Sequence, residues 1–172
     1  MLTREAQAIS DGVVSLREIS RSDAELLYEW RMDPSSRTMF RRTEVAPFDF
    51  HVSMVEQYLN SESPDRWFLV EADGKPAGTI SLYNFTDAGR ACEWGRFVIA
   101  PELRNLGRGR RALKLLMGYA QKTGIKQLKC DVLATNTVAL NLYRDLGFTQ
   151  TGLFEDGERV FLAMVADLKT GT

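Results

Sequence analysis

The feature that most constrains the fold is a run of apolar side chains that recur at the spacing of one helix face. Its members stand at positions i, i+3, i+4, i+7 and i+8, and they are Ala112, Leu115, Leu116, Tyr119 and Ala120. This spacing is typical of a helix that buries one face and exposes the other. We expect the helix to end near Gly124, because glycine commonly terminates a helix.

The rest of the chain alternates between strand and helix patterns. Strands are expected over residues 13–19, 67–72, 77–83, 91–99 and 128–133, with a last pair around Gly152 and Asp156-Gly157. The Asp73-Gly74 dipeptide between two of these strands is a strong hairpin signal. A short helix over residues 138–146 is expected to end at Gly147.

Two more helices are expected in the N-terminal part of the chain. Ser22 and Glu25 form a capping-box pattern for a helix that Asp33-Pro34 ends. Asp49 is placed to cap a second helix. The side chains on one face of that second helix are His51, Met54, Val55 and Tyr58.

Length and element order predict one α/β domain. At 172 residues the chain has the length of a single domain, and no repeat, low-complexity segment or linker divides it. The expected order is β-α-α-β-β-β-α-β-α-β-β, which predicts a mixed sheet with helices on its faces. We assign residues 12–169 to this domain and residues 1–11 to a flexible N-terminal lead.

Charge and composition exclude several classes of protein. Lys and Arg total 22 against 23 for Asp and Glu, so no global positive field exists to hold nucleic acid. No run approaches the ~18 apolar residues of a membrane span, and the N-terminus lacks the apolar core of a signal peptide. Cys92 and Cys130 are too few for a disulfide scaffold, and no cluster has metal-ligand spacing. We therefore expect a cytoplasmic protein without a metal, a membrane partner or a nucleic-acid partner.

A loop rich in glycine and arginine lies between an expected strand and the start of the strongest helix. We call residues 104–110 the phosphate loop, and its sequence is Arg104-Asn105-Leu106-Gly107-Arg108-Gly109-Arg110. Backbone N–H groups at a helix N-terminus lack partners and attract anions. The two glycines let the backbone approach a ligand closely, and the arginines add positive charge. The loop therefore predicts a diphosphate site.

Other interpretations of this loop explain less of the sequence. Gly107, Gly109 and Ala112 also fit the G-x-G-x-x-A pattern of dinucleotide-binding folds, with Asp131 about 20 residues further on. That fold requires a tight turn, whereas the expected strand ends six or seven residues before Gly107. No Walker A pattern occurs. Taken alone, the loop would also fit a solvated basic helix start.

Two motifs together resemble those of the GNAT superfamily of N-acetyltransferases. The superfamily's acetyl-CoA signature, Gln/Arg-x-x-Gly-x-Gly/Ala after a strand, matches the phosphate loop from Arg104 without a gap. A second signature matches Asn136 at a strand end, Leu142-Tyr143 on a helix, and Gly147-Phe148 after it. The resemblance implies a central mixed sheet of about seven strands flanked by about four helices, in which two strands splay apart to hold acetyl-CoA.

The resemblance also implies where acetyl-CoA binds. Its pantetheine arm would pair with the backbone of Phe97, Val98 and Ile99, between strands 91–99 and 128–133. Asn136 and Tyr143 would contact the arm from the other side. The diphosphate would lie against Arg104, Leu106, Gly107, Arg108, Gly109 and Arg110.

Three side chains are candidates for the acid–base chemistry of acetyl transfer. Tyr143 resembles the acid of the superfamily, because a phenol with a pKa of about 10 is protonated at neutral pH. Glu93 lies on the strand that leads to the cofactor, on the same side as Phe97 by simple alternation, and is a candidate base. His51, the single histidine, is a second candidate base. Each also has a purely structural interpretation: Tyr143 in an apolar stripe, Glu93 in solvent, His51 in the core.

The acceptor amine is less constrained by the sequence. The pattern of Trp30-Arg31, Arg37, Met39 and His51 resembles the superfamily branch that acetylates nucleotide-linked amino sugars. The resemblance implies that Arg31 and His51 contact the nucleotide and that Met39 and Trp94 line the sugar. Ribosomal-protein N-terminal acetyltransferases and polyamine acetyltransferases share the layout. A non-catalytic acyl-CoA-binding regulatory domain is the alternative of a different class, and a homodimer is the assembly considered.

Overall fold

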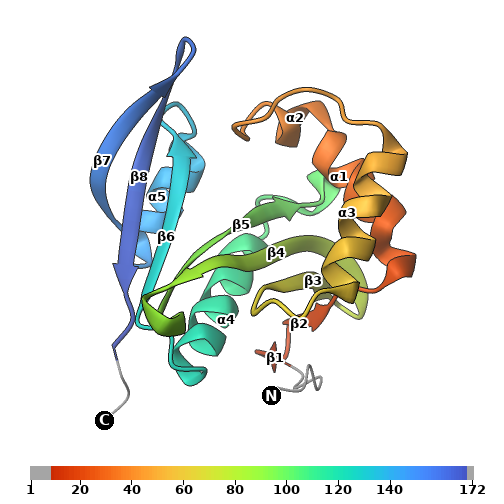
Figure 1. The fold of residues 1–172 in the computed structure, drawn as a ribbon, viewed down its shortest axis with the longest axis horizontal. Coiled ribbons are helices and arrows are strands. Elements are labelled where there is room, and N and C mark those ends of the chain that lie inside the picture. The colour runs from red at the N-terminus through yellow and green to blue at the C-terminus, as the bar shows by residue number, and fades with distance from the viewer. Residues whose placement is uncertain (1–8, 170–172) are drawn as a thin grey trace.

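A single mixed sheet runs through the protein, with helices on both of its faces (Figure 1). The computed structural model describes residues 9–169. Eight strands follow the order β1-β2-β3-β4-β5-β6-β8-β7 across the sheet. Their bounds are β1 Ile9–Ser10, β2 Val14–Glu18, β3 Arg66–Ala72, β4 Lys75–Thr86, β5 Ala91–Ile99, β6 Gln127–Leu133, β7 Thr149–Asp156 and β8 Arg159–Asp167.

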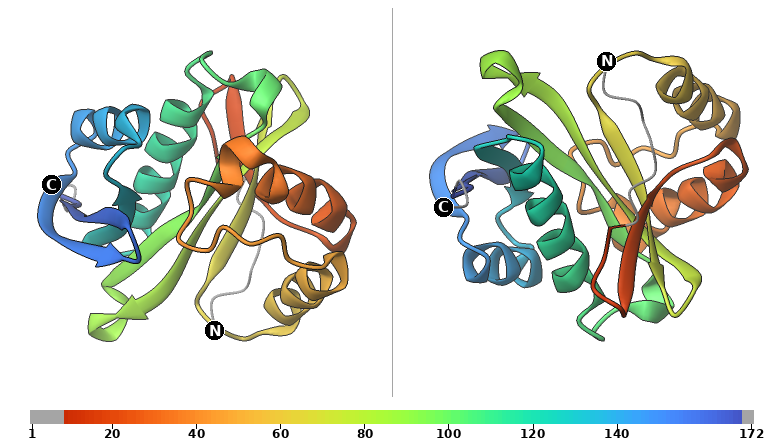
Figure 2. Two further views of the ribbon diagram at one scale, coloured as in Figure 1. Left: turned by 90° about the horizontal axis from the view of Figure 1, so that it is seen from above. Right: turned by 90° about the horizontal axis from the view of Figure 1, so that it is seen from below.

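The helices divide between the two faces of the sheet. Their bounds are α1 Ala24–Met32, α2 Pro34–Arg37, α3 Phe48–Asn60, α4 Arg108–Lys122 and α5 Thr137–Asp145. Views from above and below show α1 and α3 on one face, and α4 and α5 on the other (Figure 2). No helix in the described part of the chain is long and apolar enough to cross a membrane.

The α/β fold with a mixed sheet, expected from the sequence, is confirmed. β5 and β6 run parallel across the α4 connection, and the other neighbouring strands are antiparallel. The hairpin turn lies at Asp73-Gly74, where both residues have positive φ, 53° and 74°. The sheet has eight strands rather than about seven, and residues 9–169 form five α-helices rather than about four. The extra elements, β1 and α2, are too short to show a periodic pattern.

The first strand lies inside the segment expected to be a flexible lead. Ile9 and Ser10 pair with β2. The Asp11 carboxylate then accepts hydrogen bonds from two backbone N–H groups of the following turn, at 2.9 and 2.8 Å. The expectation of a flexible lead over residues 1–11 therefore fails for residues 9–11, and residues 1–8 lie outside the described part.

The start of α1 differs from the expected capping box. The box is formed by Ser20 and Asp23, not by Ser22 and Glu25. Oδ2 of Asp23 accepts a hydrogen bond from the backbone N–H of Ser20 at 2.7 Å. A short 3₁₀ turn over residues 21–23 precedes α1, and this turn moves the cap two residues toward the N-terminus.

The buried faces of α3 and α4 are close to those expected. Pro47 precedes α3, so Asp49 lies in the first turn of the helix rather than at its cap. In α4 the stripe is rotated slightly toward Leu113, which is fully buried, whereas Leu115 is only partly buried. The sequence pattern therefore located both helices and erred by about one residue in their orientation.

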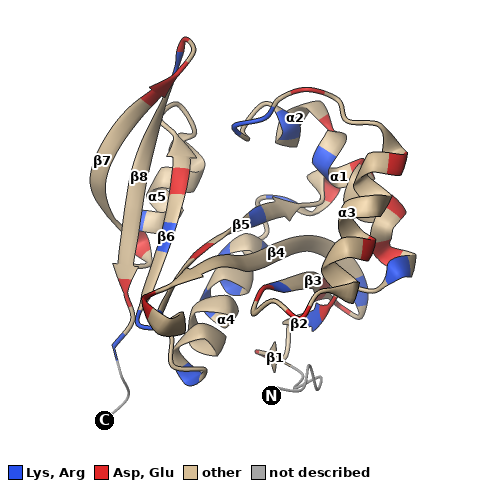
Figure 3. Cartoon of the chain, in the orientation of Figure 1, with Lys and Arg blue, Asp and Glu red and all other residues tan. Residues whose placement is uncertain are grey.

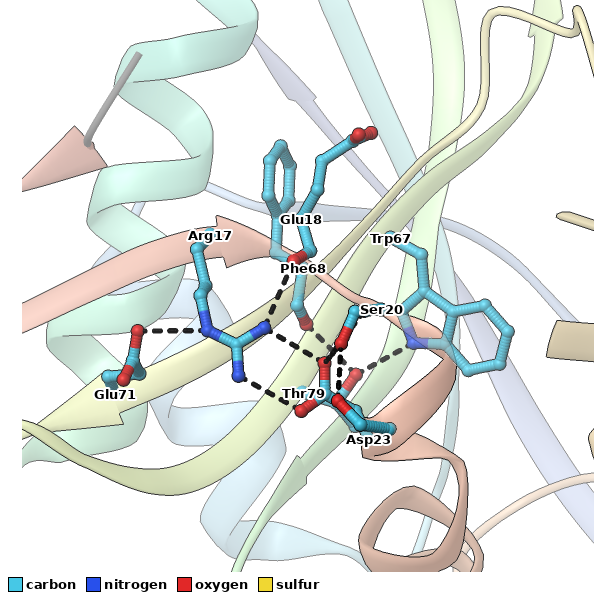
Figure 4. A network of polar contacts seen from close by, with 9 residues as sticks. Arg17, Glu18, Ser20, Asp23, Trp67, Phe68, Glu71 and Thr79 are labelled. Carbon is cyan, nitrogen blue, oxygen red and sulfur yellow. Dashed lines mark hydrogen bonds and ion pairs between the residues drawn. The ribbon is translucent and has the colours of Figure 1, made fainter. Parts of the chain in front are cut away.

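A polar network fastens the start of α1 to the sheet (Figure 4). Arg17 donates to both carboxylate oxygens of Asp23, at 2.8 and 2.9 Å, and its Nε lies 3.1 Å from Oε1 of Glu71. In the same region Nε1 of Trp67 donates to Oγ1 of Thr79 at 2.8 Å. The Thr79 hydroxyl in turn donates to a β3 carbonyl at 3.0 Å. These bonds fix the indole ring of Trp67 against the sheet.

The sheet separates two apolar cores. The larger core lies beneath α4 and α5, and the smaller one lies beneath α1 and α3. Strand β5 contributes to both, because Trp94 belongs to the larger core and Val98 to the smaller one. Cys92 and Cys130 are free thiols in the larger core, and burial raises the pKa of each to about 12. Both cysteines therefore act as small buried hydrophobic residues, as expected.

Strands β5 and β6 remain paired over a short distance only. The parallel ladder joins Ala91 to Gln127, Cys92 to Leu128 and Glu93 to Lys129, and then ends. Beyond these three pairs the strands part (Figure 1). The splayed strand pair expected from the sequence is therefore present, and β5 from Trp94 onward has no ladder partner on that side.

Candidate active site

The phosphate loop leads directly into the N-terminus of α4. Asn105 and Gly107 both have positive φ, 63° and 77°, and Arg108 is the first residue of the helix. Leu106 between them is 61% exposed. Gly109 sits so close to β5 that a Cβ there would lie 3.2 Å from the ring of Phe97. The backbone N–H groups of the first helical turn therefore lie at an accessible anion site.

Arg104 holds the phosphate loop to the rest of the protein. Its Nε donates to the carbonyl of Ile99 at 2.9 Å. Its Nη1 and Nη2 donate to the hydroxyls of Ser35 and Ser36, each at 2.7 Å. All three nitrogen atoms of the guanidinium group are thus engaged within the chain. That Arg104 contacts the diphosphate stays a prediction, and in the structure its side chain joins the end of β5 to α2.

Arg108 is better placed to meet an anion. Its Nη2 donates to Asp73 at 3.1 Å, whereas its Nε and Nη1 are buried and have no partner among the described residues. Unpartnered buried donors are costly unless a ligand or water satisfies them. Arg110 pairs with Asp145 at 2.8 Å, in a more exposed position. The donors of this loop therefore fit a diphosphate.

Asn136 and Tyr143 approach from the α5 side. Oδ1 of Asn136 accepts a hydrogen bond from the backbone N–H of Ala139 at 3.3 Å and so caps α5. The amide nitrogen of Asn136 is left free of this bond. Tyr143 packs edge-on against Trp94, with ring centroids 4.9 Å apart, and burial raises the pKa of its phenol. A phenol in this environment stays protonated at neutral pH.

A β-bulge in β5 reverses the sides to which its residues point. The register with β4 shifts between the pairs Thr79–Val98 and Ser81–Gly95, and Arg96 has a φ of 47°. Before the bulge, Trp94 points toward α4. After it, Phe97 points toward α4, so the two rings touch with centroids 5.6 Å apart. The expectation that Glu93 and Phe97 share a side by simple alternation is therefore wrong, because the bulge inserts one residue.

A cavity of about 250 Å³ lies on the opposite side of β5, beneath α1 and α3. We call it the α1–α3 cavity. Its apolar lining residues are Leu27, Met32, Ala46, Phe50, Met54, Trp67 and Val98. Its polar lining residues are Arg31, Arg42, Glu44, His51, Thr79 and Arg96. Lys and Arg positions on α1, on α2 with the loop after it, and on β5 surround the same region (Figure 3).

Arg31 and His51 both line the α1–α3 cavity, and each has an unpartnered buried polar atom. Nη1 of Arg31 and Nε2 of His51 are buried and have no hydrogen-bond partner among the described residues. His51 is only 8% exposed. Burial lowers the pKa of its imidazole, a hydrogen bond to the Ala24 backbone partly opposes this, and the charge of Arg31 adds to the lowering. The ring is therefore neutral at pH 7, and Nε2 is a free hydrogen-bond acceptor.

The other expected acceptor residues lie elsewhere. Met39 is 44% exposed and does not line the α1–α3 cavity. Trp94 is only 2% exposed and packs on the α4 side. Glu93 lies before the bulge and outside the cavity lining, and its carboxylate accepts a hydrogen bond from the Asn84 side chain. Of the four residues expected to bind the acceptor, Arg31 and His51 share the cavity, whereas Met39 and Trp94 do not.

Arg96 was missed as a site residue in the sequence. It lines the α1–α3 cavity although it follows a tryptophan and a glycine in a strand that reads as largely apolar. The available signal was Gly95, since an isolated glycine inside a strand pattern indicates a bulge. No group of His, Cys, Asp or Glu suited to a metal ion occurs within residues 9–169.

Comparison with known proteins agrees with this geometry. Residues 24–148 match the model of the Acetyltransferase (GNAT) family. The spermidine N(1)-acetyltransferase of Escherichia coli (strain K12) is 32% identical over 143 residues, which cover 81% of this chain and 74% of that protein. The chain therefore belongs to the GNAT family. It is an N-acetyltransferase that uses acetyl-CoA.

Solved structures share the same fold. A spermidine N-acetyltransferase from Vibrio cholerae, in complex with CoA and spermine, has a TM-score of 0.83 at 20% identity and covers 92% of this chain and 97% of its own. A ribosomal L7/L12 alpha-N-protein acetyltransferase in complex with coenzyme A has a TM-score of 0.83 at 15% identity, covering 96% and 100% of the two chains. At these identities the likeness concerns the fold.

The first prediction concerns Gly107. Valine at this position would be strained at a φ of 77° and would displace the backbone donors of the phosphate loop. We expect Gly107→Val to raise the Kd for coenzyme A at least tenfold, or by ~1.4 kcal/mol, as measured by calorimetry. Gly118→Ala, in the middle of α4, meets no atom within 4 Å and should leave the Kd unchanged. Equal affinity in Gly107→Val and the unmodified protein would place the diphosphate elsewhere.

Proposed function

We propose that this enzyme acetylates a primary amine carried by a negatively charged molecule, which binds in the α1–α3 cavity. The observation that carries the proposal is the charge of the cavity wall, where Arg31, Arg42 and Arg96 stand against one carboxylate, Glu44. Like charges repel strongly in a partly buried site, where the effective dielectric constant is below that of water. A polycation would be disfavoured there, whereas a carboxylate or phosphate would gain charge-assisted hydrogen bonds.

We assign acetyl-CoA to the region between the diverging strands β5 and β6. The diphosphate would contact the backbone of residues 106–110 together with Arg108, whose buried donors lack partners. The pantetheine arm would run along Phe97, Val98 and Ile99, and the free amide nitrogen of Asn136 would face it. Val98 also lines the α1–α3 cavity. An acceptor held there would therefore approach the cofactor from the other side of β5.

Acetyl transfer forms a carbon–nitrogen bond and breaks a carbon–sulfur bond. The attacking amine must be neutral, the proton it releases must be accepted, and the departing thiolate must be stabilised. We assign the last role to Tyr143. Because burial raises the pKa of its phenol, the hydroxyl keeps its proton and acts as a hydrogen-bond donor to the sulfur.

We assign the role of base to His51. Its neutral ring lines the cavity in which the acceptor would bind, and its buried Nε2 has no hydrogen-bond partner among the described residues. Glu93 remains the alternative base, but it lies outside the cavity lining and its carboxylate is already hydrogen-bonded to Asn84. An acceptor amine in the cavity would therefore meet His51 directly.

The relatives suggest which amines to compare. Their names specify spermidine and a ribosomal protein as acceptors. The relatives therefore favour the polyamine and ribosomal-protein alternatives over a nucleotide-linked amino sugar. The charge of the α1–α3 cavity favours an acidic peptide N-terminus over spermidine. A nucleotide-linked amino sugar is also negatively charged. Arg31 and His51, which were expected to contact its nucleotide, both line the cavity. Spermidine is the second candidate, favoured by the 32% identity to the Escherichia coli enzyme.

Two further expectations remain proposals. A cytoplasmic location and a homodimer, expected from the sequence, are to be tested by fractionation and by sedimentation.

The second prediction concerns Tyr143. Replacement by phenylalanine keeps the ring packed on Trp94 and removes only the hydroxyl. We expect kcat to fall about 10²-fold with little change in the Kd for coenzyme A. Tyr119→Phe, on α4 against Phe68, is the matched control and should keep full activity. Intact turnover in Tyr143→Phe would give the role to another group or to water.

The third prediction concerns the base. The pKa of His51 is lowered from 6.5, so its basic form prevails above the lowered value and is lost as pH falls through it. We expect the ascending limb of kcat/KM, at pH values below 6.5, to disappear in His51→Gln and to persist in Glu93→Gln. The reverse result would identify Glu93 as the base.

The fourth prediction compares acceptors by thiol release from acetyl-CoA. The panel contains spermidine, peptides beginning Ser-Asp-Asp, Ser-Asn-Asn and Ser-Lys-Lys, and a nucleotide-linked 4-amino-4,6-dideoxy sugar with its free sugar. We expect the acidic peptide or the nucleotide-linked sugar to have a kcat/KM at least ~10-fold above spermidine. Faster turnover of spermidine would reject an anionic acceptor and establish the second candidate.

A further inference from the structure

We propose that Arg96 selects the acceptor by binding its oxyanion, a carboxylate or phosphate, on the floor of the α1–α3 cavity. This inference rests on the proposed function and assigns its charge selectivity to one side chain. Arg96 lies in the bulge of β5, directly before Phe97, where the region assigned to the pantetheine arm begins. A group bound to it would lie beside the position where the acceptor amine must react.

No carboxylate of the described residues forms an ion pair with Arg96. Among the described residues, its guanidinium makes one hydrogen bond, from Nη1 to Oγ of Ser81 at 3.2 Å, and no ion pair. By contrast, Arg17 and Arg110 each contact a carboxylate within 3.1 Å. Burial lowers the pKa of Arg96, and the charge of Asp65 opposes this only in part, which is the direction expected for a desolvated cation that lacks a contacting counterion. An oxyanion from the acceptor would supply that counterion.

Two aromatic rings hold the guanidinium in place. Cζ of Arg96 lies 4.7 Å from the ring centroid of Trp67 and 4.9 Å from that of Tyr83. The Trp67 ring is itself fixed by its hydrogen bond to Thr79. Stacking fixes the plane of the guanidinium without using its N–H donors. The group is therefore preorganised for an oxyanion, and little side-chain entropy remains to be lost on binding.

The β5 bulge is what turns Arg96 toward the cavity. By simple alternation Arg96 would follow Cys92 and Trp94, which point into the larger apolar core beneath α4. The inserted residue reverses this pattern, so that Arg96 and Val98 both line the α1–α3 cavity. Arginine adopts a φ of 47° there, a conformation that is unfavourable for a residue with a side chain. The backbone therefore holds a strained residue that places one charge in the cavity.

The surroundings of Arg96 specify the ligand further. The His51 ring meets the Trp67 ring edge-on, with centroids 6.4 Å apart, on the side of the cavity lined by α3. His51 offers a hydrogen-bond acceptor, whereas Arg31 and Arg96 offer donors. A fitting ligand presents an N–H to His51 and an oxyanion to the arginines. An amine with a nearby carboxylate or phosphate has this arrangement, and spermidine does not.

The test compares acceptors that differ only in charge. For the unmodified enzyme, Arg96→Gln and Arg96→Lys, kcat/KM is measured with the Ser-Asp-Asp and Ser-Asn-Asn peptides, and with the nucleotide-linked and free amino sugar. We expect Arg96→Gln to lower kcat/KM at least ~10-fold for the charged member of the preferred pair, mainly through KM, and to leave its neutral member within ~2-fold. Arg96→Lys should recover part of the loss, because it restores the charge but not the planar fork.

Controls separate this inference from the proposed function. Lys114→Gln removes the same charge from the exposed side of α4 and should change neither member of a pair. Coenzyme A affinity and the thermal midpoint should be unchanged in Arg96→Gln, which establishes that the variant is folded. An unchanged charged-to-neutral ratio in Arg96→Gln would overturn the role of Arg96 while leaving an anionic acceptor in place. No preference for a charged acceptor in the unmodified enzyme would overturn both.

Discussion

The parting of β5 from β6 determines most of what this protein can do. Three residue pairs join the two halves of the sheet, and beyond Glu93 the backbone of β5 faces no strand on that side. Where the two strands have parted, Arg159 of β8 donates to the carbonyls of Thr38 and Phe40. These bonds connect the loop after α2 to the hairpin formed by β7 and β8. An extended cofactor arm can form hydrogen bonds with the unpaired backbone groups of β5. These groups would already be paired if β5 and β6 stayed together along their whole length.

Strand β5 also divides the chemistry between the two faces of the sheet. Trp94 and Phe97 point toward α4 and Tyr143, whereas Arg96 and Val98 point toward α1 and α3. The aromatic side excludes water and keeps the phenol protonated. The other side offers guanidinium groups and a neutral imidazole. Under the proposed function, this one irregular strand would separate the group that stabilises the thiolate from the groups that recognise the acceptor.

The sequence predicted those features that local patterns encode. The phosphate loop, the Asp73-Gly74 hairpin and β5 itself depend on a few consecutive residues, and all lie where expected. The alternation of apolar and polar residues along β5 did not predict the bulge at Arg96. One inserted residue leaves the alternation regular on each side of the bulge. Met39 and Trp94 were placed by resemblance rather than by pattern, and the side to which each points depends on long-range packing. The positions of elements were therefore predictable, whereas the residues of the cavity were predicted only in part, at Arg31 and His51.

Arg104 links parts of the molecule that are far apart in sequence. It joins the end of β5 to the hydroxyls of Ser35 and Ser36 on α2, and residues 38–47 after α2 continue into the wall of the α1–α3 cavity. Under the proposed function, this one guanidinium group would connect the loop that holds the diphosphate to the segment that lines the acceptor cavity. The site proposed for acetyl-CoA and the cavity proposed for the acceptor are therefore joined through three hydrogen bonds of a single side chain.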